Sequence, residues 1–219
     1  MAHHLVISGV SEGFQLEAEA VASSGKKLRK FAMTAYTGVS MNLGWGLPIV
    51  VDLAGMKIPS KSIPILFSHD AQQIVGHTTE IEIYGESLQK MRVKGIISGV
   101  GDAAQEVIAL ADNEFPWQAS IGAAIDGKME LVEKGETVKV NGRSFSGPLY
   151  VARSTVLGEV SFVPIGADMN TSATVAASMK GNTMNPELKV WLEAKGIKAE
   201  TVAPELIPVL QAAFDAEKK

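Results

Sequence analysis

The sequence of 219 residues contains no cysteine, which rules out disulfide bonds and zinc sites built on thiolates. It has no uninterrupted run of 18 apolar residues, so we expect no transmembrane helix and no membrane partner. The first residues lack the charged start and the long apolar stretch of a secretory signal peptide. We therefore expect the protein to stay in the compartment where it is made.

Patterns for several common ligands are missing as well. The full phosphate-loop pattern G-x-x-x-x-G-K-[ST] and the dinucleotide pattern G-x-G-x-x-G do not occur. His69, Asp70 and His77 form the only local cluster of metal-ligating side chains, and their spacing matches no standard zinc motif. The net charge is −4 and no basic stripe is present, which disfavours nucleic acid as a partner. The sequence thus predicts no metal, no cofactor and no nucleic-acid partner.

What the sequence does contain is a series of short strand patterns over residues 5–177. Apolar and polar residues alternate with a period of two, and glycine-rich breaks separate the segments. Such a series predicts a mainly β fold with peripheral helices (α+β), arranged as a barrel or a sandwich. The predicted strands lie at 6–10, 31–37, 49–53, 63–67, 80–84, 91–97, 117–125 and 155–164, with a hairpin or loop at 139–151.

Helical patterns occupy fewer positions. A helix is predicted over 103–112, with Asp102 as its cap and Gln105 completing a capping box. Residues 178–183 are small and polar and indicate a linker. Beyond it, Asn185 and Pro186 are typical of a helix start, and a second helix is expected over 203–217. These patterns divide the chain into a β domain, 5–177, and a short helical extension, 178–219.

His69 is the first candidate for acid–base chemistry. It follows the apolar run 63–67 and shares strand parity with its odd-numbered members, so we expect it to continue an inward-facing row. The ordinary pKa of histidine, about 6.5, suits proton transfer near neutral pH. A purely structural histidine is the alternative interpretation.

Ser120 is a candidate nucleophile on the predicted strand 117–125. Gln118, Ser120, Gly122 and Ala124 would share one face, and three of them are small, so another backbone could approach closely. A peptide-cleaving nucleophile needs such access, but so does tight sheet packing. Gln118 stands where the G-x-S-x-G elbow of α/β hydrolases requires glycine, so that elbow is excluded.

Glu159 is a carboxylate within an otherwise apolar strand pattern. Burying a carboxylate there is costly unless it is paired. Orienting a catalytic histidine is one such pairing, and a salt bridge or a position at the rim of the sheet is the other.

Several segments occur in a telling order along the chain. They are Leu66-Phe67-Ser68-His69-Asp70 with Val75-Gly76-His77, the predicted helix around 103–110, Ala119-Ser120-Ile121-Gly122, Leu157-Gly158-Glu159-Val160-Ser161-Phe162-Val163, and Asp168-Met169-Asn170-Thr171-Ser172-Ala173. Together they resemble the prohead maturation serine proteases of tailed phages (the caudovirus prohead protease family), over about residues 30–176.

That resemblance implies a fold and a set of site residues. The family is similar to the herpesvirus assembly protease, a closed or partly open β-barrel ringed by helices. Ser120 would be the nucleophile, His69 its base and Glu159 the third member, with Arg153 and Gly122 at the oxyanion or substrate site. Asp126, Glu130 and Asp168 are alternatives to Glu159, and Arg143 is an alternative to Arg153.

The resemblance also implies a biological setting. The chain would be a serine endopeptidase that cleaves scaffold and capsid proteins, and itself, inside the assembling prohead in the host cytoplasm. Its partners would be a scaffold protein or scaffold domain, the major capsid protein and a second copy of the chain. The alternative function is a non-catalytic barrel that binds scaffold or capsid protein. The helical extension would serve as a scaffold-like region, a dimerisation element or a propeptide.

Overall fold

The computed structural model describes residues 19–21, 27–44, 46–176, 185–199, 202 and 206–217. Two compact units make up the chain, Met1–Ala176 and Ala177–Lys219. The first unit is mainly β with few helices, as the sequence predicts. The predicted strand at 6–10 lies outside the described residues.

The strands of the structure include most of the predicted segments, although the one predicted over 80–84 begins already at Asp70 and those at 19–21, 56–57, 130–132 and 172–175 were not predicted. In chain order, the strands are β1 (Glu19–Val21), β2 (Lys27–Tyr36), β3 (Ile49–Val51), β4 (Met56–Lys57), β5 (Pro64–Phe67), β6 (Asp70–Tyr84), β7 (Lys90–Ile96), β8 (Gln118–Ile125), β9 (Glu130–Val132), β10 (Thr137–Val140), β11 (Arg143–Ser146), β12 (Leu149–Ala152), β13 (Thr155–Val163) and β14 (Ser172–Val175).

Most of these strands belong to one sheet with the order β1-β2-β7-β6-β5-β13-β4, to which β14 is added beside β2 and β8 beside β13. The registered strand pairings do not connect β14 to β8 within the described residues. One backbone hydrogen bond does join these two regions, from Ala173 N to Trp117 O at 2.9 Å. The pairings therefore leave the sheet unclosed.

The main hydrophobic core packs against this sheet. Alternate residues of β2 and β13 point into it, and Phe31, Met33, Val160 and Phe162 are almost completely buried. The rings of Phe31 and Phe162 meet edge to face, with their centroids 5.6 Å apart. This packing fixes β13 firmly in the sheet, and β13 carries part of the candidate site.

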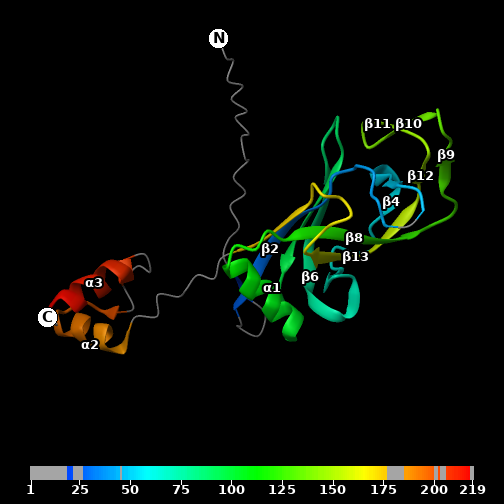
Figure 1. Ribbon diagram of the computed structural model, residues 1–219. Coiled ribbons are helices and arrows are strands. Elements are labelled where there is room, and N and C mark those ends of the chain that lie inside the picture. Colours follow the sequence, from blue (N-terminus) through cyan, green and yellow to red (C-terminus); the bar gives the residue numbers. More distant parts are fainter. Residues whose placement is uncertain are drawn as a thin grey trace, which may run out of the picture. The chain divides into compact units, whose positions relative to one another are not determined.

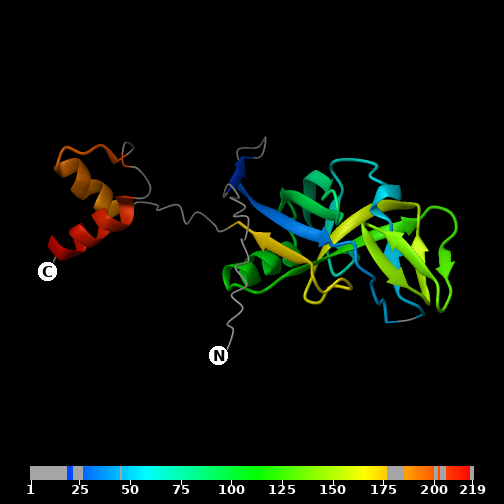
Figure 2. The same ribbon diagram turned by 90° about the horizontal axis from the view of Figure 1, so that it is seen from above.

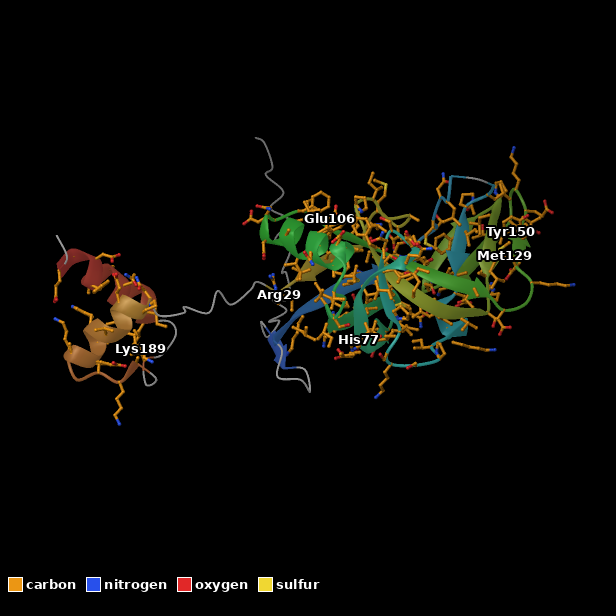
Figure 3. All side chains as sticks on the ribbon, turned by 90° about the horizontal axis from the view of Figure 1, so that it is seen from below. Arg29, His77, Glu106, Met129, Tyr150 and Lys189 are labelled. Carbon is orange, nitrogen blue, oxygen red and sulfur yellow. The ribbon has the colours of Figure 1, made fainter. Side chains whose placement is uncertain are left out.

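A smaller three-stranded sheet, β3-β12-β9, and the β10–β11 hairpin form one end of the first unit (Figures 1 and 2). Their buried valines and leucine make a separate cluster that includes Val50, Val132 and Leu149. Figure 3 marks this end by Met129 and Tyr150, and marks the opposite end by Arg29 and Glu106.

Helix α1 (Asp102–Asp112) packs against β6 (Figure 1). The helix lies where the sequence predicts it, but its cap is Gly101, so Asp102 is the first helical residue. The predicted capping box between Asp102 and Gln105 is therefore wrong. A glycine cap leaves no side chain to bond the first turn, and Asp102 instead places its negative charge near the positive end of the helix.

The second unit contains α2 (Pro186–Ala194) and α3 (Ile207–Glu217). The Asn185 side chain accepts a hydrogen bond from Glu187 N at 2.9 Å, as expected for a helix cap. The two helices bury Leu188, Leu192 and Phe214 against each other. Among the helices of the described residues, none has the length and apolar character needed to cross a membrane.

Candidate active site

Ser120 lies on β8, which pairs in antiparallel fashion with β13. It stands directly opposite Ser161 in this pairing. Opposite residues of an antiparallel pair project to the same face, which places Ser120, Ser161 and Glu159 together. Val160 and Phe162 point to the other face of β13, into the core.

A β-bulge in β13 sets the direction of Glu159. Leu157 pairs with Ala123, whereas Glu159 pairs with Gly122, so Gly158 is an extra residue between them. In a regular strand Leu157 and Glu159 would share a face. The bulge separates them: Leu157 is completely buried, whereas the Glu159 side chain is 15% exposed and its carboxylate reaches His69.

His69 lies in a different position from the one expected. β5 ends at Phe67 and β6 begins at Asp70, so Ser68 and His69 form a two-residue hairpin turn. Their φ angles are +52° and +63°, as in a type I′ turn. The prediction that His69 continues an inward-facing row was wrong, because His69 belongs to this turn and not to the alternating residues of a strand.

A chain of hydrogen bonds joins the three predicted residues. His69 Nε2 lies 2.9 Å from Ser120 Oγ, and His69 Nδ1 lies 2.7 Å from Glu159 Oε1. An ionised carboxylate can only accept, so Nδ1 carries the ring proton. Nε2 is then the free acceptor for the Ser120 hydroxyl proton.

The electrostatics of this chain favour a basic histidine. The hydrogen bond that His69 donates to Glu159 raises the pKa of His69 above its ordinary value of 6.5, against the lowering effect of partial burial. The His69 side chain is 43% exposed, so water and substrate can reach it. The arrangement can therefore remove a proton from Ser120 and later return one.

A cleft of about 590 Å³ opens beside Ser120 and His69, between the large sheet and the β3-β12-β9 sheet. Apart from His69, none of the described residues that line it carries a titratable side chain. Its apolar walls include Met41, Ile49, Val51, Ile121, Ala123 and Ile165. The cleft can thus hold a neutral, largely apolar segment against the hydroxyl group.

Two further residues shape the surroundings of Ser120, and the sequence analysis missed the role of both. Gln118 accepts a hydrogen bond from Gly166 N at 2.6 Å and donates one to Met169 O at 3.0 Å, which holds the loop between β13 and β14. Ser161 bonds both Glu159 and the backbone of His69. Each lies two residues from a predicted site residue, the spacing that places side chains on one face of a strand.

Gly122 lies opposite Glu159 rather than in the cleft wall. A Cβ at this position would overlap the Glu159 carboxylate, with Oε1 as its nearest atom. The absence of a side chain at Gly122 is therefore what allows Glu159 to reach His69.

The three alternative carboxylates are occupied elsewhere. Asp126 pairs with Lys57 at 2.5 Å, on the surface. Asp168 is buried, and its Oδ2 accepts hydrogen bonds from Thr37 N and Thr37 Oγ1 at 2.6 and 2.7 Å. Glu130 pairs with an arginine at 2.6 Å. Of the four candidates, only Glu159 contacts His69.

Neither predicted arginine lies at Ser120. Arg153 is the partner of Glu130 and also donates to Asp52 at 2.9 Å, and it does not line the cleft. Arg143 donates to Thr37 O at 3.5 Å, in a separate hollow. The structure brings together Ser120, His69 and Glu159 and leaves both arginines apart from them.

His77 lies on β6 in the large sheet (Figure 3) and bonds Ser98 rather than any site residue. The distance from His77 Nδ1 to Ser98 Oγ is 2.8 Å. This second histidine–serine pair has no carboxylate bonded to its imidazole among the described contacts. The described residues also contain no group of three or more histidine, aspartate or glutamate side chains arranged to hold a metal ion.

No protein-family model matches the chain, and no curated protein matches it. Fifteen chains of solved structures do match. One is the Kaposi's sarcoma herpesvirus protease with a hexapeptide phosphonate inhibitor, at 13% identity and a TM-score of 0.37, covering 86% of this chain and 88% of that chain. Another is the same virus's protease with an allosteric inhibitor, at 13% identity and a TM-score of 0.38, covering 80% and 95%.

Proposed function

We propose that this protein is a serine endopeptidase in which Ser120 is the nucleophile, His69 the general base and Glu159 the residue that orients His69. One observation carries the proposal. The Ser120–His69–Glu159 hydrogen-bond chain, with distances of 2.9 and 2.7 Å, opens onto an uncharged cleft. A nucleophile bonded to a base that a third group orients is the general pattern of nucleophilic catalysis.

The chemistry follows from these positions. Ser120 Oγ attacks the carbonyl carbon of a peptide bond while His69 Nε2 takes the hydroxyl proton. The same proton passes to the leaving amine as the carbon–nitrogen bond breaks, which leaves an acyl-enzyme. His69 then activates water for hydrolysis of the ester. Glu159 stabilises the imidazolium that forms in each half of the reaction.

The proposal extends to the biological substrates. The order of the sequence segments around His69, Ser120 and Glu159 supports scaffold and capsid proteins of a tailed-phage prohead as substrates. The large sheet would then form a partly open barrel. A second copy of the chain and the prohead interior belong to the same proposal. Intact mass spectrometry tests it by comparing wild type and Ser120→Ala with a scaffold-bearing capsid protein. Fragments from the wild type alone are expected.

A fluorophosphonate probe tests the nucleophile without a known substrate. The Ser120 oxygen would bond to phosphorus, fluoride would leave, and His69 would take the proton, so one adduct should form on Ser120. The matched control is Ser98→Ala, which removes the hydroxyl group that bonds the His77 ring and leaves the candidate site untouched. Labelling should persist in Ser98→Ala and disappear in Ser120→Ala. Absence of labelling and of cleavage in folded wild type would overturn the proposal and favour a non-catalytic assembly module.

A further inference from the structure

We propose that Ser161 is a positioning residue for this site, and that its hydroxyl group ties the Glu159 carboxylate to the backbone of the turn that carries His69. This inference rests on the proposed function. It concerns how the two residues behind Ser120 are held, and it adds a fourth side chain to the three predicted from the sequence.

The hydrogen bonds of Ser161 form a closed ring. Ser161 Oγ donates to Glu159 Oε2 at 2.7 Å and accepts from His69 N at 3.0 Å. The other carboxylate oxygen, Glu159 Oε1, bonds the His69 ring at 2.7 Å. The base and the acid are thus linked twice, once through the imidazole and once through the Ser161 hydroxyl.

Burial distinguishes Ser161 from Ser120, although the two serines face each other across the strand pair. Ser161 is completely inaccessible to solvent and does not line the cleft, so it cannot act as a nucleophile. Its only hydroxyl proton is committed to Glu159, because a hydroxyl group has one donor. Ser161 therefore acts through Glu159 and His69 and never touches substrate.

The turn at Ser68 and His69 explains why such a tie is needed. Both residues have positive φ, a backbone conformation that is unfavourable for residues other than glycine. Two bonds to β13 hold this turn: Ser68 N to Phe162 O at 3.0 Å, and His69 N to Ser161 Oγ. The second bond is the one that fixes the backbone of His69 itself, and it ties that backbone to the same carboxylate that bonds the imidazole.

The test is Ser161→Ala, compared with wild type. Loss of the hydroxyl should lower kcat about 10-fold to 10²-fold, the cost of a misplacement of about 1 Å, while KM for a peptide substrate changes little. The pKa of His69, measured by NMR in a Ser120→Ala background, should fall toward its ordinary value because Glu159 no longer holds a fixed position. Ser161→Cys, which restores a weaker donor, should recover part of both properties.

A matched control separates positioning from plain stability. Thr78 is also almost completely buried, and its hydroxyl bonds the backbone at Lys61 and Ile63, away from the cleft. Thr78→Val should lower the unfolding temperature without changing kcat or the His69 pKa. If Ser161→Ala behaves like Thr78→Val in all three measurements, the positioning role is overturned. The NMR titration decides this even if the chain shows no peptidase activity, so the two proposals fail separately.

Discussion

At the scale of single residues, the site depends on the coupling of one imidazole to one carboxylate. Glu159 fixes the tautomer of His69 and raises its pKa. The raised pKa gives the stability of the fold and the proposed activity opposite dependences on pH. The protonated pair stabilises the fold below the unfolded-state pKa of His69. That stabilisation is lost as the pH rises through the folded-state pKa. Activity has the reverse dependence, because only neutral His69 can accept the Ser120 proton.

This coupling predicts the pH dependence of the proposed peptidase activity. The acidic limb of kcat/KM should have its midpoint above 6.5, since Glu159 raises the pKa of His69. Glu159→Gln should move that pKa down and lower kcat by about 10⁴-fold, the size of effect seen when the orienting carboxylate of a serine protease is made neutral. A pH–rate profile and an NMR titration of His69 check both parts. A midpoint that Glu159→Gln leaves unchanged would contradict the assigned role.

The position of a site residue could be predicted from the sequence where it follows from the local strand pattern, and could not where it depends on contacts with residues distant in the sequence. The strands of Ser120 and Glu159 are both visible in the sequence, but the direction of Glu159 also depends on the bulge at Gly158. His69 does not follow the alternation, because the positive φ angles of its turn depend on anchoring to β13. Arg153 was expected at the oxyanion or substrate site. It is instead paired with Asp52 and Glu130, which are far from it in sequence.

At the scale of elements, the close approach of β8 and β13 controls the position of Glu159. The strand segments were predictable from their period of two, whereas the bulge at Gly158 was not, because it exists only in the pairing of two strands. The β10–β11 hairpin overlaps the hairpin or loop predicted at 139–151, and its turn has a local sequence signal. Asn141-Gly142 is the typical sequence of a type I′ turn, and both residues have positive φ.

Gly122→Ala tests this strand pairing. The new Cβ would overlap the Glu159 carboxylate and displace it from His69, so kcat should fall by about 10²-fold or more. Peptidase assays on the purified variant check this. The matched control is Gly158→Ala on the facing strand, where an added Cβ would meet only Gly122 O at 3.4 Å, an ordinary contact. Equal activity losses in the two variants would show that backbone flexibility, rather than room for Glu159, matters here.

At the scale of the whole molecule, the two units have separate hydrophobic clusters. The first unit encloses the large cluster around Phe31 and Phe162, and the second has its own small cluster around Leu188 and Leu192. All the residues of the candidate site belong to the first unit. We therefore expect the stability of the second unit to vary without consequence for the cleft.

Leu192→Ala examines that independence. Removing a completely buried leucine costs about 2–5 kcal/mol, enough to unfold a small helical unit. Circular dichroism should show the loss of helix, while the unfolding temperature of the β unit and the peptidase rate stay the same. Val190→Ala, on the same helix but 66% exposed, should leave both units folded. A shift in the β transition with Leu192→Ala alone would show that the units are thermodynamically coupled.

The place of β13 in the sheet has a consequence for the dynamics of the site. β13 pairs with β4, β5 and β8, and its inner face is buried in the core. Segments held in this way exchange their amide hydrogens only through the largest opening motions of a protein. Glu159 and Ser161 should therefore show amide protection close to that of global unfolding. A site held so rigidly has little scope for control by local opening, so control of its activity should act through access to the cleft.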